Sequence, residues 1–120
     1  MTDLRLDRVS VSFHERLLRQ MKCAASRMYP VTLHHTHGGT MKNAGWHVGM
    51  AQRQNPFLQI PLHAIYHVGK HGIDAGVGVL QWENTFGGQI GMLAWVNGQL
   101  TYDLFEMAQI WEHENRSKTL

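Results

Sequence analysis

A long glycine-bearing stretch between two short β-prone runs constrains the fold of this chain more than any other feature. Residues 31–35 and 57–60 are rich in residues that favour strands, whereas residues 36–56 contain four glycines and one proline. A loop of this length in a small domain is usually functional or disordered. Because Pro61 and Gly69 then bracket a short helix at about 62–68, we expect a strand–loop–strand–helix unit.

Further helices are expected on both sides of this unit. Their apolar positions and their glycine and proline breaks predict helices at about 12–28, 79–86, 89–96 and 101–114. The chain has 120 residues, of which 43% are hydrophobic, and this fits one domain, 1–120, with its own core. The predicted class is therefore α+β. A single cysteine excludes an intrachain disulfide framework and a four-cysteine zinc site.

The histidines are unusually numerous and clustered. The chain has nine, and seven of them lie between residues 34 and 71. Histidine is the commonest metal ligand and the usual acid–base group near neutral pH. His34 and His35 end the first strand-like run, and His63 and His67 share one face of the short helix. Such a unit can gather ligands around one divalent ion, although chance spacing in a histidine-rich chain is the alternative.

The charge is divided along the chain. Residues 34–71 contain Lys42, Arg53 and Lys70 and no acidic residue. This zone suits an anionic partner such as a nucleic-acid backbone, and the alternative is a basic patch without a partner. No apolar run approaches the ~18 residues of a membrane span, and the first residues lack the apolar core of a signal peptide. We therefore expect no membrane association and a cytoplasmic location.

The sequence carries an ordered set of motifs: Leu33-His34-His35, Gly49-Met50-Ala51-Gln52-Arg53, Ile60-Pro61-Leu62-His63-Ala64-Ile65-Tyr66-His67, His71-Gly72-Ile73-Asp74-Ala75-Gly76 and Gln81-Trp82-Glu83. Together they resemble the HNH-type nucleases of phages, and in particular the Ref-like, RecA-dependent nucleases of phages and prophages. The resemblance covers about residues 10–96. Residues 97–120 would then be a helical C-terminal extension of the same domain.

The resemblance implies a ββα-metal (HNH, treble-clef-like) core with flanking N- and C-terminal helices. The implied activity is metal-dependent DNA endonucleolytic cleavage in a bacterial host cell, with Mg²⁺, Mn²⁺ or Zn²⁺ as the ion. The implied partners are DNA and RecA or another recombination protein. One alternative is a degenerate HNH domain that binds nucleic acid or protein without cutting. Another is a metal-binding domain unrelated to nucleases.

The resemblance also assigns roles to individual residues. His35 takes the position of the general base that activates water, and His34 and His67 take metal-ligand positions. Asp74 falls on a later ligand position, for which His71 is the rival. Arg53 falls on the family's arginine and, with Lys42 and Lys70, is expected to contact phosphate.

Two departures from the family pattern bear on these roles. The family's structural zinc is bound by two pairs of residues, which here are Cys23 with Ser26 and His63 with Tyr66. Ser26 and Tyr66 are poor zinc ligands, so the resemblance implies that this zinc has been lost and that Cys23 is an ordinary buried thiol. His63 would then have a packing role, unless it joins His67 in the active metal site.

The remaining histidines and one strand position complete the expectations. The family's second-strand Asn or Asp falls near Leu58, which cannot orient a histidine, and Asn55 lies out of register. His37 and His47 lie in the glycine-rich loop and are expected to be exposed or to face DNA rather than to bind the metal.

Overall fold

Two short antiparallel strands form the centre of the structure, a computed structural model that describes residues 8–46 and 54–117. Strand β1 (Thr32–His35) pairs with β2 (Gln59–Leu62), with His34 opposite Ile60. All four residues of β2 are buried, so this strand runs through the core. The chain is thus a small α+β domain, and the expected order of strand, loop, strand and short helix is observed.

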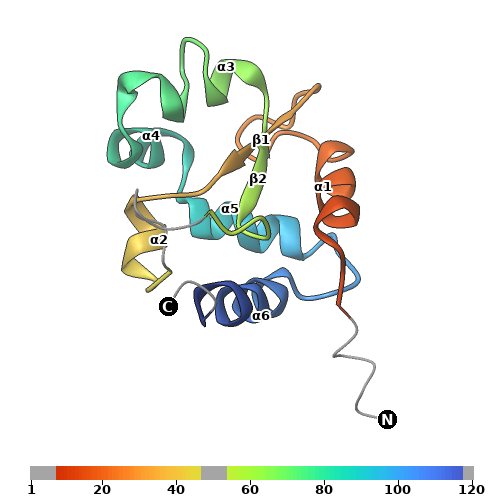
Figure 1. The fold of residues 1–120 in the computed structure, drawn as a ribbon. Coiled ribbons are helices and arrows are strands. Elements are labelled where there is room, and N and C mark those ends of the chain that lie inside the picture. Colours follow the sequence, from red (N-terminus) through yellow and green to blue (C-terminus); the bar gives the residue numbers. More distant parts are fainter. Residues whose placement is uncertain (1–7, 47–53, 118–120) are drawn as a thin grey trace.

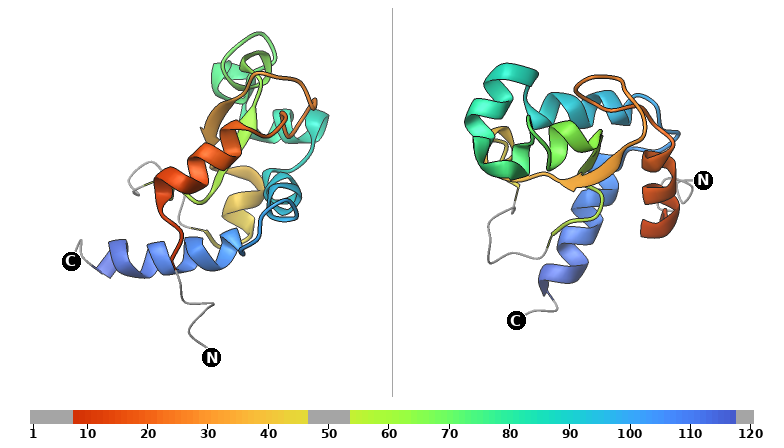
Figure 2. Two further views of the ribbon diagram at one scale, coloured as in Figure 1. Left: turned by 90° about the vertical axis from the view of Figure 1, so that its right-hand side faces the viewer. Right: turned by 90° about the horizontal axis from the view of Figure 1, so that it is seen from above.

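Helical segments surround the hairpin (Figure 1). Figure 1 places α1 to the right of the strands, α4 to the left, α3 above them and α6 across the bottom. Figure 2 gives the same arrangement from two further directions. The segments are α1 (Val11–Arg19), α2 (Gly39–Asn43), α3 (Ala64–His67), the π-type turn η2 (Ile73–Val77), α4 (Val79–Phe86), α5 (Gln89–Asn97) and α6 (Leu104–Ser117).

The first helix is shorter than predicted, because the segment after it bonds to other parts of the chain. Helix α1 ends at Arg19, not near Met28. The backbone N–H of Ala24 donates to the carbonyl of Pro61 at 2.8 Å, which draws the segment away from the helix and onto β2. The N-cap is Ser10, whose side chain accepts from the N–H of Phe13 at 3.1 Å.

The long loop also contains a short helix that its glycines conceal. Helix α2 forms where Met41 becomes fully buried, so tertiary burial outweighs the weak local preference for a helix. Strand β2 begins two residues later than predicted and includes Pro61, opposite Leu33. A proline is tolerated there because each strand has only one partner in this two-stranded sheet.

The core lies between the hairpin and the surrounding helices. Trp82 of α4 is fully buried, and its indole N–H donates to the carbonyl of His71 at 2.9 Å. The other fully buried apolar side chains come from β2, from the turn after α1 and from four helices. They are Leu18, Cys23, Met41, Ile60, Leu62, Leu93, Val96, Leu104 and Ala108. This core fixes the hairpin against α4 and α5, whose polar residues reach the site described next.

Candidate metal centre

His34 reaches the site from β1 and is 1% exposed. Successive side chains of a strand point to opposite faces, so burial of His34 directs its neighbour His35 to the other side of β1. One ring nitrogen of His34, Nδ1, lies 3.1 Å from Oδ2 of Asp74, and the other, Nε2, lies 3.1 Å from Oε1 of Gln89. Both nitrogens of a buried ring therefore have partners from distant segments.

Asp74 is the centre of a group of three histidines. It lies on η2, and its carboxylate oxygens are 3.1 Å from His34 Nδ1, 3.1 Å from His37 Nε2 and 3.0 Å from His67 Nε2. Burial acts to raise the pKa of this carboxyl group. Hydrogen bonds and charge from the three histidines outweigh burial and hold the pKa of Asp74 well below its usual range. Asp74 is therefore an anion over the whole physiological range.

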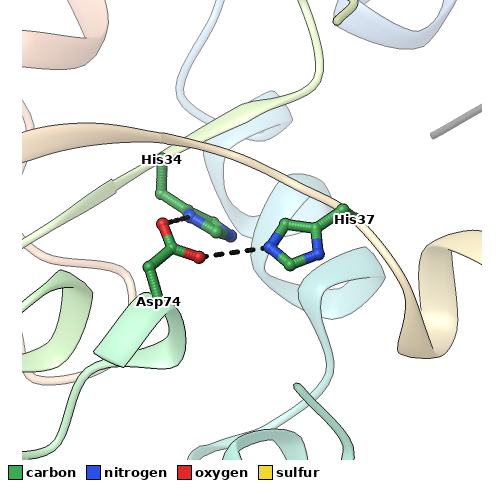
Figure 3. A group of neighbouring side chains, drawn as sticks. All are labelled: His34, His37 and Asp74. Atoms are coloured by element: carbon green, nitrogen blue, oxygen red, sulfur yellow. Dashed lines mark hydrogen bonds and ion pairs between the residues drawn. The ribbon is translucent and has the colours of Figure 1, made fainter. Parts of the chain in front are cut away.

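Three of these residues have the geometry of a metal site. Figure 3 shows His34 and His37 converging on the two oxygens of Asp74. One ligand atom from each of the three lies within 4.8 Å of the other two, so His34, His37 and Asp74 could hold a metal ion. Within the part of the chain that the structure describes, no other group of three or more His, Cys, Asp or Glu side chains has this geometry.

His67 adjoins the three-residue group from the helix after the hairpin. Its ring lies edge-on to the ring of His34, with 5.1 Å between centroids, and contacts the same carboxylate oxygen. Burial lowers the pKa of His67, as does His34, while Asp74 opposes the change. The expected convergence of a strand histidine, a helix histidine and Asp74 is therefore present.

One side of the site is closed to solvent, and the opposite side is open. The His34 side chain is 1% exposed, that of Asp74 33% and that of His37 41%. A ligand bound to the buried ring would thus be reachable from solvent along the His37 edge. This combination of a fixed interior ligand and an accessible edge is what a catalytic metal site needs, because an open coordination position must remain for water or substrate.

His37 was expected to be exposed or to face DNA rather than to bind the metal. Its side chain is 41% exposed, as expected, but its ring also bonds to Asp74 within the group that could hold a metal ion. His37 follows His34 by three residues, immediately after β1, and this His-x-x-His spacing was the available signal. His47 lies outside the described residues.

His35 is not one of the three residues of this group, but its ring lies close enough to His34, His67 and Asp74 for them to act on its pKa. In the strand register it is opposite Gln59, whose side chain donates to Glu15 Oε2 at 2.6 Å. Burial lowers the pKa of His35, and the neighbouring His34 and His67 act in the same direction. Glu15 opposes them. The role of His35 as a base stays a prediction.

The structure places His63 and His71 outside the group around Asp74. His63 is the N-cap of α3, where its Nδ1 accepts from the N–H of Ile65 at 3.3 Å. The ring of His71 packs against Tyr66 and Phe86. Both were candidate metal ligands, and these local roles do not bring them to the Asp74 carboxylate.

The basic residues expected to contact phosphate are only partly described. Lys42 is exposed at the end of α2, and Lys70 is exposed in the turn after α3. Arg53 lies outside the described residues.

Four positions that the family uses for zinc come from two neighbouring turns. Cys23 is fully buried, and its sulfur accepts from the N–H of Ser26 at 3.3 Å. Burial acts to raise the pKa of the Cys23 thiol. Hydrogen bonds from Ser26 and from the backbones of His63 and Ala25 outweigh it and lower the pKa. The turn at 23–26 is thus joined to the start of α3.

Gln89 and Glu83 are site residues that the motifs did not identify as such. Gln89 is fully buried at the start of α5 and bonds both to His34 and to the backbone of His37. Glu83 of α4 accepts from Gln89 and from Thr40. Burial acts to raise the pKa of Glu83, but these hydrogen bonds outweigh it and lower the pKa. No sequence pattern distinguishes a buried glutamine in such a site from a glutamine at the surface.

No protein-family model, no curated protein and no solved structure matches the chain, so comparisons with known proteins add no family to this description.

None of the helices in the described ranges, 8–46 and 54–117, has the length and apolar character needed to cross a membrane.

Proposed function

We propose that the chain is a metal-dependent DNA endonuclease with a ββα-metal centre made of β1, β2 and α3. One observation carries the proposal: His34 of the first strand and His67 of the following helix meet on the carboxylate of Asp74. These are the three ligand positions that the HNH resemblance assigns. The order of strand, strand and helix supports this proposal, and so does the metal-binding chemistry of these side chains. Neither argument depends on any single motif.

The ligand set suits a divalent ion. Imidazole nitrogens favour ions such as Zn²⁺ over Mg²⁺, while a carboxylate accepts either class. His34, His37 and Asp74 would hold the ion, and His67 would orient the carboxylate or join as a fourth ligand. When bound, the ion would supply Lewis-acid polarisation of a scissile phosphate and stabilise the leaving oxygen.

His35 has the properties of a general base in this proposal. Its pKa is lowered by burial, so the ring is neutral near pH 7 and can accept a proton from an attacking water. The exposed ammonium groups of Lys42 and Lys70 would neutralise backbone phosphates, and Arg53 is proposed for the same role. The proposed setting is DNA recombination in a bacterial cell carrying a phage or prophage, with RecA or another recombination protein as the proposed partner.

The two turns at 23–26 and 63–66 support the same family independently of the active site. In the proposed family these turns carry a structural zinc, and here the backbone N–H of Ala24 donates to the carbonyl of Pro61 at 2.8 Å, which brings the two turns close together. The proposal therefore includes a former zinc knuckle in which hydrogen bonds to Cys23 have replaced the ion.

The test is a nicking assay on supercoiled plasmid. Purified protein is incubated with Mg²⁺, Mn²⁺ or Zn²⁺, with and without excess EDTA, beside the variants His34→Ala, His35→Ala and His113→Ala. We expect metal-dependent nicking by the wild type and by His113→Ala, an exposed-histidine control on α6. His34→Ala should lose metal binding and nicking together, whereas His35→Ala should keep the metal and lose at least ~100-fold in rate. Equal nicking by all four proteins would refute the assignment.

A binding function without cleavage is favoured by one observation. The strand position that orients the catalytic histidine in the family is Leu58, which is 1% exposed and has no polar group. Asn55 does not replace it, since its side-chain amide donates to the carbonyl of Ala108 and to Glu112. If no ion supports nicking while the protein retains salt-sensitive DNA binding, this second function replaces the first.

A further inference from the structure

The amide group of Gln89 has only one orientation that its partners accept. Its Oε1 lies 3.1 Å from the backbone N–H of His37, which can only donate. Its Nε2 lies 2.7 Å from the carbonyl of His37 and 3.1 Å from Oε2 of Glu83, which can only accept. Rotating the amide by half a turn would oppose like groups at all three contacts. Because Gln89 is fully buried, water cannot compensate for such a mismatch.

This orientation determines which nitrogen of His34 carries hydrogen. The atom of Gln89 that faces His34 is Oε1, an acceptor, and it lies 3.1 Å from Nε2 of the ring. Nε2 must therefore donate. In a neutral imidazole only one nitrogen is protonated, so Nδ1 has a free lone pair.

The free lone pair of His34 points at an anion. Nδ1 lies 3.1 Å from Oδ2 of Asp74, which carries no hydrogen in the ionised carboxylate. Two acceptors at this distance repel each other unless a hydrogen or a metal ion lies between them. When the ring also carries a hydrogen on Nδ1, that hydrogen donates to Asp74, and in the neutral Nε2–H ring a bound ion would take its place. The buried ring is thus held with Nδ1 directed into the group of residues that could hold a metal ion.

His67 repeats the arrangement on the other side of the same oxygen. Its Nδ1 lies 2.7 Å from the hydroxyl of Thr32, and that hydroxyl donates to the carbonyl of Leu62 at 3.1 Å. With its proton used in this way, the hydroxyl accepts from Nδ1, which leaves Nε2 bare at 3.0 Å from Asp74. In their neutral forms the two rings therefore direct lone pairs at one carboxylate oxygen, and in their protonated forms they donate to it.

Glu83 holds Gln89 in place. Its two carboxylate oxygens accept from the N–H and the hydroxyl of Thr40, at 3.0 and 2.8 Å, and from the N–H of Gln89 at 2.8 Å. This brace joins α2, α4 and the start of α5 around the backbone of His37. The orientation of Gln89 therefore depends on the folded arrangement of three helices, not on a local preference.

We propose that Gln89 is the positioning residue of the metal centre: it holds His34 as the Nε2–H tautomer, so that Nδ1 is the metal-binding atom. The inference rests on the proposed metal site and extends it by naming the ligand atom and the residue that selects it. Outer hydrogen bonds of this kind fix the ring orientation of histidine ligands and typically change metal affinity by roughly 10- to 100-fold.

The first test needs no variant and no metal. In ¹⁵N-histidine-labelled, metal-free protein at alkaline pH, long-range ¹H–¹⁵N spectra distinguish a protonated from a bare ring nitrogen, and comparison with His34→Ala assigns the signals. We expect His34 to show a protonated Nε2 and a bare Nδ1. A protonated Nδ1 with a bare Nε2 would overturn the inference, even if the protein proves to bind metal and to cut DNA.

The second test measures affinity. Titration with Zn²⁺ and Mn²⁺ compares the wild type with Gln89→Met, which keeps the side-chain length without its hydrogen bonds, and with Gln81→Met, the same change at an exposed position of α4. We expect Gln89→Met to bind at least 10-fold more weakly and Gln81→Met to bind like the wild type. Thr40→Val, which removes one contact of the brace, should give an intermediate loss if Gln89→Met does not fold. Equal affinities in all folded variants would refute the role of Gln89, whereas a wild type that binds no ion would refute the proposed metal site itself.

Discussion

The stability of the protein should fall between pH 8 and pH 5 because of one buried histidine outside the proposed site. His14 on α1 is fully buried; its Nδ1 lies 2.6 Å from the hydroxyl of Tyr102, and its Nε2 has no hydrogen-bond partner. The ring packs against Phe57, with 4.9 Å between centroids. Burial lowers the pKa of His14 from 6.5 to about 4, and Glu15 opposes this only in part.

The sign and the size of the effect follow from proton linkage. The unfolded chain takes up the proton near pH 6.5 and the folded chain only near pH 4, so the unfolded state binds more protons between these values. Stability from this source is complete above pH 6.5 and is lost as the pH falls toward 4. One pKa unit corresponds to about 1.4 kcal/mol, so the full effect is about 3 kcal/mol, of which about 2 kcal/mol is lost by pH 5.

Urea denaturation at pH 8, 7, 6 and 5 measures this loss. The variant His14→Asn keeps a polar group near the position of Nδ1, opposite Tyr102, but cannot titrate. It should be less stable at every pH, because it loses ring packing, yet its free energy of unfolding should fall by about 2 kcal/mol less than that of the wild type between pH 8 and pH 5. His113→Ala should follow the wild type. Parallel pH curves for the wild type and His14→Asn would refute the reasoning.

Three further predictions concern the site and its surroundings. Asp74→Asn removes the carboxylate that the three histidines share, so Zn²⁺ affinity measured by calorimetry should fall by more than the roughly 10- to 100-fold typical of residues that merely support a ligand. An unchanged affinity would exclude this carboxylate as a ligand. Gly39→Ala should lower the free energy of unfolding, measured by urea denaturation, by about 2 kcal/mol or more. The φ angle of Gly39 is +47°, and the new Cβ would lie 2.2 Å from Oε1 of Glu83. The matched control Gly45→Ala also has a positive φ but meets nothing within 4 Å, so a similar loss there would show that the clash contributes nothing. The double substitution Ser26→Cys and Tyr66→Cys should add one zinc ion per chain by elemental analysis, and unchanged zinc content would argue against a former zinc knuckle.

Much of the fold could be predicted from the sequence because the residues that begin and end its helices act locally. Gly78, the Gly87-Gly88 pair and Gly98 flank α4 and α5 and act on their immediate neighbours, so these helices are predicted to within one residue. The prediction for the segment after Arg19 failed for the opposite reason. The backbone N–H of Ala24 donates to the carbonyl of Pro61, about forty residues away, and no local pattern records that contact.

The site divides in the same way. His34, His67 and Asp74 could be grouped because strand, helix and motif order set their approximate positions. His37 is exposed as expected, but its contact with Asp74 was missed, because glycine-rich surroundings give no sign that the chain turns back toward Asp74 just after β1. Gln89 was missed because its importance lies in four hydrogen bonds that only the folded chain brings together.

The brace that Glu83 forms with Thr40 and Gln89 has a consequence for the order of events in folding. His34 is separated by 40 residues from Asp74 and by 55 from Gln89, and contacts that close such long loops form late. On the ribosome, the ring of His34 has no fixed tautomer until residue 89 has emerged and α5 has docked. We therefore expect a metal-sensitive optical signal, such as that of Co²⁺, to appear after helical circular dichroism during refolding. The ion would then report that folding is finished, rather than serve as the nucleus around which the chain folds.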